Sequence, residues 1–166
     1  MYKKKRFSVA VWTRMYRTNL IKENVLYFKE GILHEDENWT PKVLLVAKRV
    51  GYISIPFYHY VIRNNSITQM ENRKKHIADV LNTCKELEEE YNKRDISESN
   101  KRILKDYLAR LYINTCTFGK YDGNFYINIV DKKFPLRNSY FIKTKIESLI
   151  YVLSIPLYKY IKLKYS

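Results

Sequence analysis

Glycine, proline and cysteine are scarce in this chain, which holds four, four and two of them among its 166 residues. So few Gly and Pro residues exclude collagen-like repeats and Gly-rich linkers. Two cysteines are too few for a disulfide-stapled scaffold, so a reducing compartment is the simpler interpretation. Uninterrupted apolar runs stay well short of the roughly 18 residues that a spanning helix needs. The 46% hydrophobic content still suits one folded domain with a sizeable core, and it excludes a wholly disordered chain.

The excess positive charge is confined to the two ends of the chain. Residues 1–22 hold seven Lys or Arg and no acid, residues 132–166 hold eight and one acid, and the residues between hold sixteen of each sign. Basic segments of this kind favour nucleic acid or an anionic membrane as partner. No RNP-like motif, zinc-finger spacing or helix-turn-helix pattern is visible, so we expect no nucleic-acid partner. Because lysines alternate with Tyr, Ile and Leu in the tail, we expect an anionic membrane surface instead.

Short elements of both kinds are predicted before residue 70. A helix is expected over Thr18–Glu23, with Thr18 as its N-cap. A second helix is expected over Pro41–Val50, because Pro is tolerated at the first helical position, and Gly51 would end it in the left-handed conformation. Runs of β-prone residues predict three strands, at Val25–Phe28, Tyr52–Ile55 and Phe57–Ile62.

Two long amphipathic helices are predicted in the middle of the chain. Apolar residues recur every three or four positions from Ile77 to Tyr91, and again from Ile103 to Thr115. A turn around Ser97–Ser99 makes an antiparallel helical hairpin the economical arrangement. Both cysteines fall on or beside apolar helix faces and are expected to be small buried side chains: Cys84 and Cys116.

These elements divide the chain into three predicted parts. Residues 1–70 carry the mixed helix and strand pattern, and residues 71–135 carry the helical hairpin. Residues 136–166 form a basic amphipathic tail that is broken at Pro156. The predicted fold class is therefore α+β and mostly helical.

Three adjacent carboxylates, Glu35, Asp36 and Glu37, stand immediately before the predicted second helix. A helix N-terminus favours their ionised form, whereas their mutual repulsion pushes at least one pKa up. A general base that works near neutral pH benefits from such a balance. The alternative is a charge cluster that merely caps the helix. No second acidic cluster or paired histidine is evident, so no metal site is predicted.

The stretch from Trp12 to Gln69 carries an ordered series of short motifs. A Trp followed by a basic residue and Tyr-Arg precedes F-x-E-G-I, then the Glu35-Asp36 pair, then a helix. Pro-x-Tyr-x-Tyr and an Arg before an Asn-Ser-Ile turn complete the series. In this order and spacing the motifs resemble the acceptor-side half of family 2 glycosyltransferases, the inverting GT-A enzymes that build bacterial capsule, exopolysaccharide and O-antigen chains. The resemblance covers about a third of the chain and implies a partial Rossmann-like GT-A core.

The resemblance also implies roles for individual residues. Asp36 would be the general base that takes a proton from an acceptor hydroxyl, and Glu35 would orient the acceptor or tune Asp36. Arg63 would touch the leaving diphosphate as a bidentate donor, although it could equally be a surface charge at a strand end. Three further side chains would line the acceptor side: Trp12, Arg14 and Trp39. For Trp39, a place in the core is equally compatible with the sequence.

A complete enzyme of this kind holds its nucleotide-sugar on a Rossmann-like first half, which ends in an Asp-x-Asp motif that binds a divalent Mn or Mg ion. This sequence contains no Asp-x-Asp. We therefore expect a C-terminal, acceptor-side fragment of a hexosyltransferase-type enzyme of cell-surface polysaccharide synthesis, inactive alone and with no cofactor of its own. Whether the chain alone is an enzyme stays open.

The resemblance implies partners as well. We expect a glycan or lipid-linked acceptor, together with either a donor-half protein or a second copy of the chain. The expected location is cytoplasmic, at the inner face of the cell membrane. The alternative function is a basic peripheral membrane or interaction module without catalytic activity.

Overall fold

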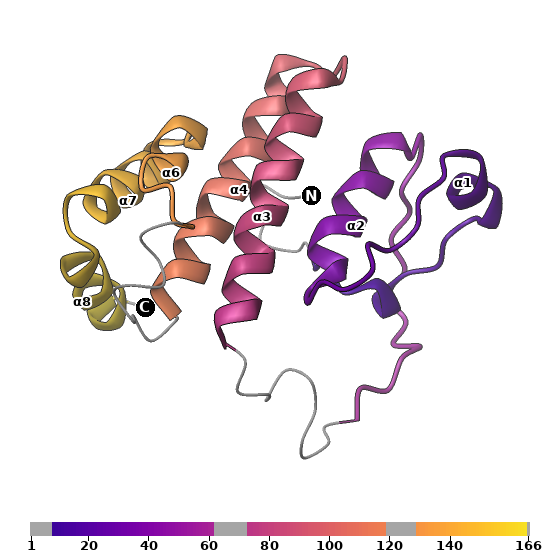
Figure 1. Ribbon diagram of the computed structural model, residues 1–166. Helices are drawn as coiled ribbons and strands as arrows, with labels where there is room; N and C mark the ends of the chain where they lie inside the picture. Colours follow the sequence, from indigo (N-terminus) through magenta and orange to yellow (C-terminus); the bar gives the residue numbers. More distant parts are fainter. Residues whose placement is uncertain (1–7, 62–72, 119–128, 166) are drawn as a thin grey trace.

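The computed structural model describes residues 8–61, 73–118 and 129–165, and within them it is built of helices joined by irregular segments (Figure 1). The elements are η2 (Val11–Thr13), α1 (Thr18–Glu23), α2 (Glu35–Val46), α3 (Arg73–Lys93), α4 (Glu98–Phe118), α6 (Phe134–Asn138), α7 (Ile142–Leu153) and α8 (Ile155–Tyr165). The predicted, mostly helical character is therefore confirmed. The three predicted parts of the chain stay a prediction.

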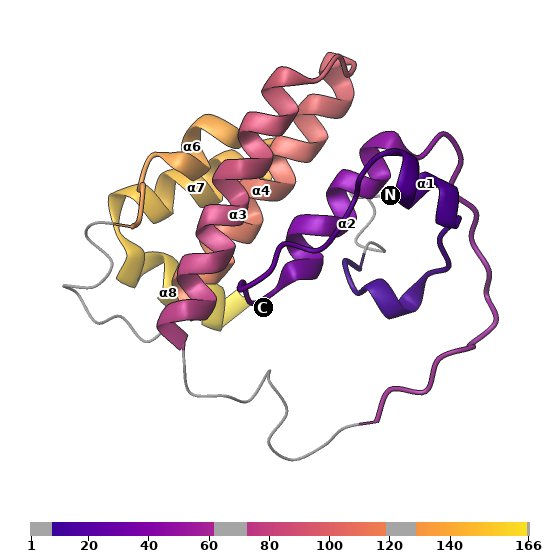
Figure 2. The same cartoon turned by 45° about the vertical axis from the view of Figure 1, so that its right-hand side comes forward.

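The α3–α4 hairpin forms the centre of the molecule, and the two helices run antiparallel (Figures 1 and 2). The predicted apolar row of α3 is buried, because residues three and four apart share one helix face. In α4 the predicted Ile103 and Thr115 are only half-buried, and the buried row instead runs through Leu104, Leu108 and Tyr112. The main core combines them with side chains from the later helices: Ile77, Val80, Leu81, Cys84, Leu87, Tyr91, Leu104, Leu108, Tyr112, Ile113, Cys116, Phe134, Tyr151 and Tyr158. The predicted hairpin and the burial of both cysteines are confirmed.

A buried carboxylate attaches the tail to the hairpin. Asp106 of α4 is 1% exposed, and its Oδ1 accepts hydrogen bonds from the backbone N–H groups of Tyr140 (2.9 Å) and Phe141 (3.0 Å). Its Oδ2 accepts the Thr144 hydroxyl at 2.8 Å. Asp106 therefore satisfies the backbone donors at the start of α7. The N-cap residue of α7, Phe141, makes no capping hydrogen bond with its side chain.

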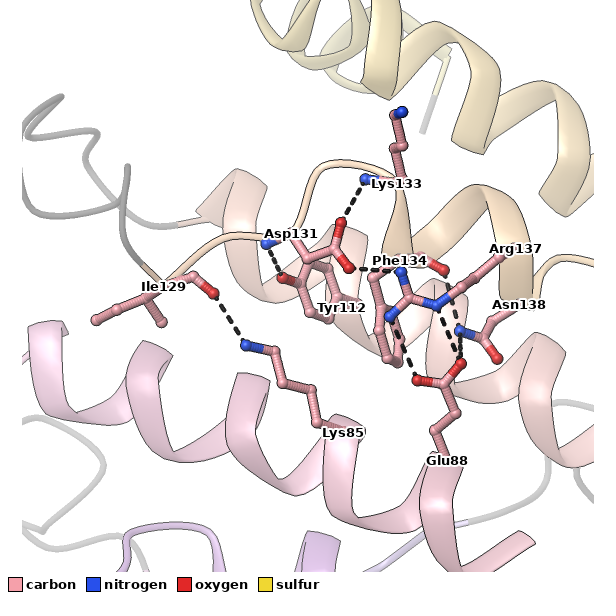
Figure 3. A network of polar contacts seen from close by, with 9 residues as sticks. All are labelled: Lys85, Glu88, Tyr112, Ile129, Asp131, Lys133, Phe134, Arg137 and Asn138. Atoms are coloured by element: carbon pink, nitrogen blue, oxygen red, sulfur yellow. Dashed lines mark hydrogen bonds and ion pairs between the residues drawn. The ribbon is translucent and has the colours of Figure 1, made fainter. Parts of the chain in front are cut away.

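A polar network ties α6 to α3 (Figure 3). The Arg137 guanidinium lies between the carboxylates of Glu88 and Asp131, with Nε 3.2 Å from Glu88 Oε1. Asn138 donates to the same Glu88 carboxylate at 2.8 Å. The Tyr112 hydroxyl accepts the backbone N–H of Asp131 at 2.7 Å. Since these contacts connect α3, α4 and the segment before α6, they fix the tail against the hairpin.

The N-terminal region lies on the α3 side of the hairpin, with α2 between α3 and α1 (Figure 2). Its own core is small and consists of Leu26, Trp39 and Val43 with partly buried neighbours. The Thr40 hydroxyl donates to the Val9 carbonyl at 2.7 Å, which ties the start of the described chain to α2.

The predicted strands are wrong for the residues that the structure describes. Residues 25–28 and 52–61 are extended or irregular backbone and belong to no sheet, and Ile62 lies outside the described residues. A strand is stabilised by hydrogen bonds and side-chain pairs with a neighbouring strand. No described segment supplies such a neighbour, so the β-prone side chains of residues 52–61 stay exposed, Tyr52 by 85%.

The limits of the predicted N-terminal helices also need correction. Helix α2 begins at Glu35, not Pro41, and ends at Val46, so Pro41 lies inside it. Gly51 does not adopt a left-handed conformation; among described glycines Gly31 does, with φ of 75°. Helix α1 has the predicted bounds, but its N-cap is Arg17.

The tail is helical, as its amphipathic pattern indicates, but it breaks at Ser154 instead of Pro156. Pro156 is the second residue of α8, where a missing N–H group costs little because no intrahelical acceptor is in reach. Within the described residues, every helix is too short or too polar to cross a bilayer.

Candidate active site

The three adjacent carboxylates lie in the first turn of α2. The sequence pattern placed them just before the helix, and that placement is wrong. His34 leads into this turn in the left-handed conformation, with φ of 60° and ψ of 45°. Non-glycine residues adopt that conformation uncommonly. The helix N-terminus therefore begins directly after His34, and its dipole favours the ionised form of the acidic side chains in its first turn.

Asp36 is half-buried within this turn. Its Oδ1 accepts the backbone N–H of Glu37 at 3.0 Å. Burial raises the pKa of Asp36, and the neighbouring Glu35 carboxylate raises it further, against the opposing effect of the hydrogen bond. The sequence predicted a raised pKa from repulsion between the carboxylates. The direction is confirmed, but desolvation is the larger cause.

Glu37 points inward, toward the hairpin. The Tyr107 hydroxyl of α4 donates to Glu37 Oε2 at 2.8 Å. Burial raises the pKa of Glu37 to about 7, although the hydrogen bond from Tyr107 opposes that rise. Glu37 therefore anchors the acidic turn to α4, while Asp36 remains partly open to solvent.

The segment before the turn is held against α3. His34 Nε2 lies 2.7 Å from His76 Nδ1, a hydrogen bond that requires one of the two rings to donate. The Leu33 backbone N–H donates to Asp79 Oδ2 at 2.8 Å. Lys75 joins this group by bonding both to Asp79 at 2.9 Å and to the Gly31 carbonyl at 2.7 Å. The backbone that leads into Asp36 is therefore held against α3 at Gly31, Leu33 and His34.

Trp39 follows Asp36 one turn later on α2 and is a core residue, 5% exposed. Its indole N–H donates to the Leu26 carbonyl at 3.0 Å, and Tyr16 packs edge-on against its ring at 4.9 Å. Of the two interpretations that the sequence left open for Trp39, the structure favours the core.

The remaining acceptor-side candidates lie on other segments. Trp12 of η2 is 43% exposed and stacks on Tyr60, with 6.0 Å between the ring centroids. Arg14 bonds within its own segment, to the Ala10 carbonyl at 3.1 Å and to the Ser8 carbonyl. Arg63 lies outside the described residues. The structure thus gathers Glu35 and Asp36 in one turn, and their assigned roles, like those of Trp12 and Arg14, stay predictions.

Two features of the site were not predicted as functional: the Glu37–Tyr107 hydrogen bond and the His34–His76 pair. Glu37 was visible as the third acid of the run, but its partner lies 70 residues further along the chain. The histidines are 42 residues apart. Such long-range pairs leave no periodic signal in the sequence.

A polar hollow of about 240 Å³ lies beside the segment that leads into α2. Residues from that segment and from α3 line it: Lys29, Ile32, Asp79, Asn82, Thr83, Lys85, Glu86 and Glu89. Such a lining offers hydrogen-bond donors and acceptors to a polar ligand. Among the described residues, those of this hollow included, no group of three or more His, Cys, Asp or Glu could hold a metal ion.

Comparison with known proteins relates this chain to glycosyltransferases. It is 26% identical over 94 residues to the uncharacterised glycosyltransferase YibD of Escherichia coli (strain K12). These aligned residues make up 52% of this chain and 27% of YibD. It is 29% identical over 109 residues to the poly(ribitol-phosphate) beta-N-acetylglucosaminyltransferase TarS of Staphylococcus aureus (strain MW2), covering 64% of this chain and 19% of TarS. The chain thus spans about a quarter or less of the curated relatives it matches. No family model matches the chain, and no solved structure matches it significantly.

Proposed function

We propose that this chain is the acceptor-side part of an inverting, family 2 glycosyltransferase of the GT-A type, with Asp36 as its general base. The observation that carries the proposal is the state of Asp36. Its carboxylate is half-buried in the first turn of α2, with a raised pKa. A base with a pKa closer to working pH is a stronger proton acceptor than an ordinary Asp. The partial similarity to two named glycosyltransferases supports the same reaction class.

In the proposed step, a hydroxyl oxygen of the acceptor attacks the anomeric carbon of a nucleotide-sugar. The new C–O bond forms as the bond to the diphosphate breaks, with inversion at that carbon. Asp36 Oδ takes the proton from the hydroxyl, and the nucleoside diphosphate leaves with the bonding electrons. Glu35 tunes Asp36 by keeping its pKa raised, and Arg63 is the proposed contact to the departing diphosphate.

Glu37 and His34 position this base in the proposed mechanism. The Tyr107–Glu37 hydrogen bond fixes the acidic turn from within, and the contacts of Leu33 and His34 with α3 fix the backbone before it. A base that is held in place loses less orientational freedom when the acceptor binds. We propose no step through a metal ion, because the described residues offer no site for one.

The proposed setting is the synthesis of a cell-surface polysaccharide at the cytoplasmic face of the membrane, on a glycan or lipid-linked acceptor. TarS takes its name from poly(ribitol-phosphate) and an N-acetylglucosaminyl group. Poly(ribitol phosphate) is therefore a reasonable first probe of the acceptor for this chain, and a nucleotide-activated N-acetylglucosamine is a reasonable first probe of the donor.

The sequence contains no Asp-x-Asp motif, and leaving-group stabilisation carries a large share of such transfers. We therefore propose that the chain alone does not turn over. The test is incubation of the purified chain with a panel of UDP- and GDP-sugars, Mn²⁺ and poly(ribitol phosphate), with the Asp36→Asn variant in parallel. No turnover is the expected result. Robust turnover that Asp36→Asn abolishes would contradict the inactivity but support the base.

Adding a nucleotide-binding half, expressed separately from a relative such as TarS, extends the test to the base itself. Where turnover appears, Asp36→Asn should lower it by about 10²–10⁴-fold, the usual contribution of a general base. Glu23→Gln is the matched control, because Glu23 is an exposed acid at the end of α1, outside the motifs that carry the resemblance. Equal turnover by the wild-type and Asp36→Asn chains would contradict the assigned role.

A further inference from the structure

The outer face of α7 is an apolar stripe that no described element covers. Ile142, Ile146, Leu149 and Leu153 are 79, 54, 50 and 74% exposed. Their spacing of four, three and four residues places them in one row along the helix. Thr144, Ser148 and Tyr151, on the opposite face, are buried toward the hairpin. The exposed row therefore points away from the core, and in Figure 1 α7 lies on the far side of the hairpin from α2.

Helix α8, which packs beside α7, also exposes apolar side chains. Three of them are about half-exposed or more: Leu157 (49%), Tyr160 (62%) and Leu163 (86%). Single exposed apolar residues are ordinary, but a row of them along one helix, with further ones on the adjoining helix, is typical of a binding surface.

Lysines border the stripe on both sides. At about 100° per residue, Lys143 and Lys145 lie roughly 90° and 70° to either side of the row's centre. Helices α7 and α8 together hold five lysines and one acid, Glu147, whose Oε1 lies 3.6 Å from Lys162 Nζ. Lysine stems can lie along apolar surface while their ammonium groups reach polar surroundings. An apolar row between lysines is complementary to a partner with an apolar interior beneath an anionic outer layer.

We propose that the outer face of α7, extended by α8, docks on an anionic lipid surface. The stripe would enter the boundary between headgroups and acyl chains, and the flanking lysines would lie at the level of the lipid phosphates. Helix α7 would lie in the membrane plane. A second copy of this chain is a poorer occupant, because each copy would bring a face with five lysines and one acid against a face of the same sign.

The experiment is co-sedimentation of the full chain with vesicles of pure phosphatidylcholine, and with vesicles in which about a third of the lipid is phosphatidylglycerol. Binding to the anionic vesicles and little to the neutral ones is expected. The Ile142→Glu/Leu153→Glu double variant should bind at least about tenfold more weakly, because it removes apolar contact and adds repulsion. These are the two most exposed residues of the row, so the fold should be unaffected, which circular dichroism checks.

Ile55→Glu is the matched control, because Ile55 is similarly exposed (68%) but lies in the N-terminal region. It should bind like the wild-type chain. Absence of binding to anionic vesicles would overturn the proposal, as would equal binding by the double variant. Self-association that the double variant abolishes, without vesicle binding, would identify a second copy as the occupant. This proposal does not depend on sugar transfer, so its failure would leave the proposed role of Asp36 untouched and would bear only on the proposed membrane setting.

Discussion

The N-terminal region, residues 8–61, and the helical region, residues 73–118 with 129–165, differ in how they bury apolar side chains. The helical region buries fourteen hydrophobic residues in one continuous core, whereas the N-terminal region buries three. Seven large apolar residues between Tyr52 and Val61 are instead exposed. The helical region forms its core from its own helices, and Leu45 of α2 packs against that core. The N-terminal region holds the candidate site but depends on α3 and α4 for its anchoring.

This difference suggests that stability resides in the hairpin, and that the acidic turn is held in place by a small number of polar contacts with it. Four substitutions sharpen or break the comparison. They are taken from the largest expected effect to the smallest.

The first substitution is Leu108→Ala in the centre of α4, where the side chain is fully buried. It should lower the free energy of unfolding by about 4 kcal/mol, because it removes apolar contact and leaves a cavity. Chemical denaturation followed by circular dichroism measures the change. Leu163→Ala, at an 86% exposed position of α8, is the control and should change stability by less than about 0.5 kcal/mol. Similar effects at the two positions would contradict the described core.

The second is Glu37→Gln, at the junction of the two regions. Burial raises the pKa of Glu37 from 4.5 to about 7, so the folded chain binds a proton more tightly than the unfolded chain. The free energy of unfolding should therefore fall as the pH rises between these values, by about 3 kcal/mol in total. Gln cannot ionise and can still accept the Tyr107 hydrogen bond, so the variant should lose this part of the pH dependence.

Denaturation of both chains at pH values from 4.5 to 8 measures the difference in slope. Asp36 also has a raised pKa and contributes in the same direction in both chains, so the difference between them reports Glu37. Parallel curves for the wild-type and Glu37→Gln chains would show that Glu37 is not buried against Tyr107.

The third is Asp106→Asn, which tests the attachment of the tail. Asp106 accepts three hydrogen bonds from the start of α7, and Asn has only one oxygen to accept them. A loss of about 2 kcal/mol is expected, within the range for hydrogen bonds to a charged group. Amide hydrogen exchange should show the loss concentrated in α7. Asp95→Asn, at an exposed position between α3 and α4, serves as control, and equal exchange in α7 for both variants would argue against the capping role.

The fourth is Trp39→Phe in the small N-terminal core. Phe keeps most of the apolar contact but removes the indole N–H that bonds to the Leu26 carbonyl. We expect a cost of about 1 kcal/mol, measured by denaturation. Because that core is small, the loss should appear as faster amide exchange in α2 and leave α3 unchanged. A uniform change over both regions would indicate a closer coupling than the structure implies.

The sequence predicted the helical region far better than the N-terminal one, and the reason is physical. The apolar rows from Ile77 to Tyr91 and from Ile103 to Thr115 predict helices because helical hydrogen bonds are local. A strand at Tyr52–Ile55 depends on a partner that no neighbouring residue reveals. The raised pKa of Asp36 could be anticipated from the acidic run. Its larger cause, burial, could not, since the packing of this turn involves α3 and α4.

The most direct measurement of the central claim is an NMR titration of the Asp36 side-chain carboxyl carbon in the folded chain, with and without poly(ribitol phosphate). The same carbon in the chain unfolded in urea provides the reference. The account predicts a midpoint above that of the unfolded chain, and a change in the Asp36 signal when the polymer is added. A midpoint equal to or below the unfolded value, with no response to the polymer, would contradict Asp36 as a base that meets the acceptor.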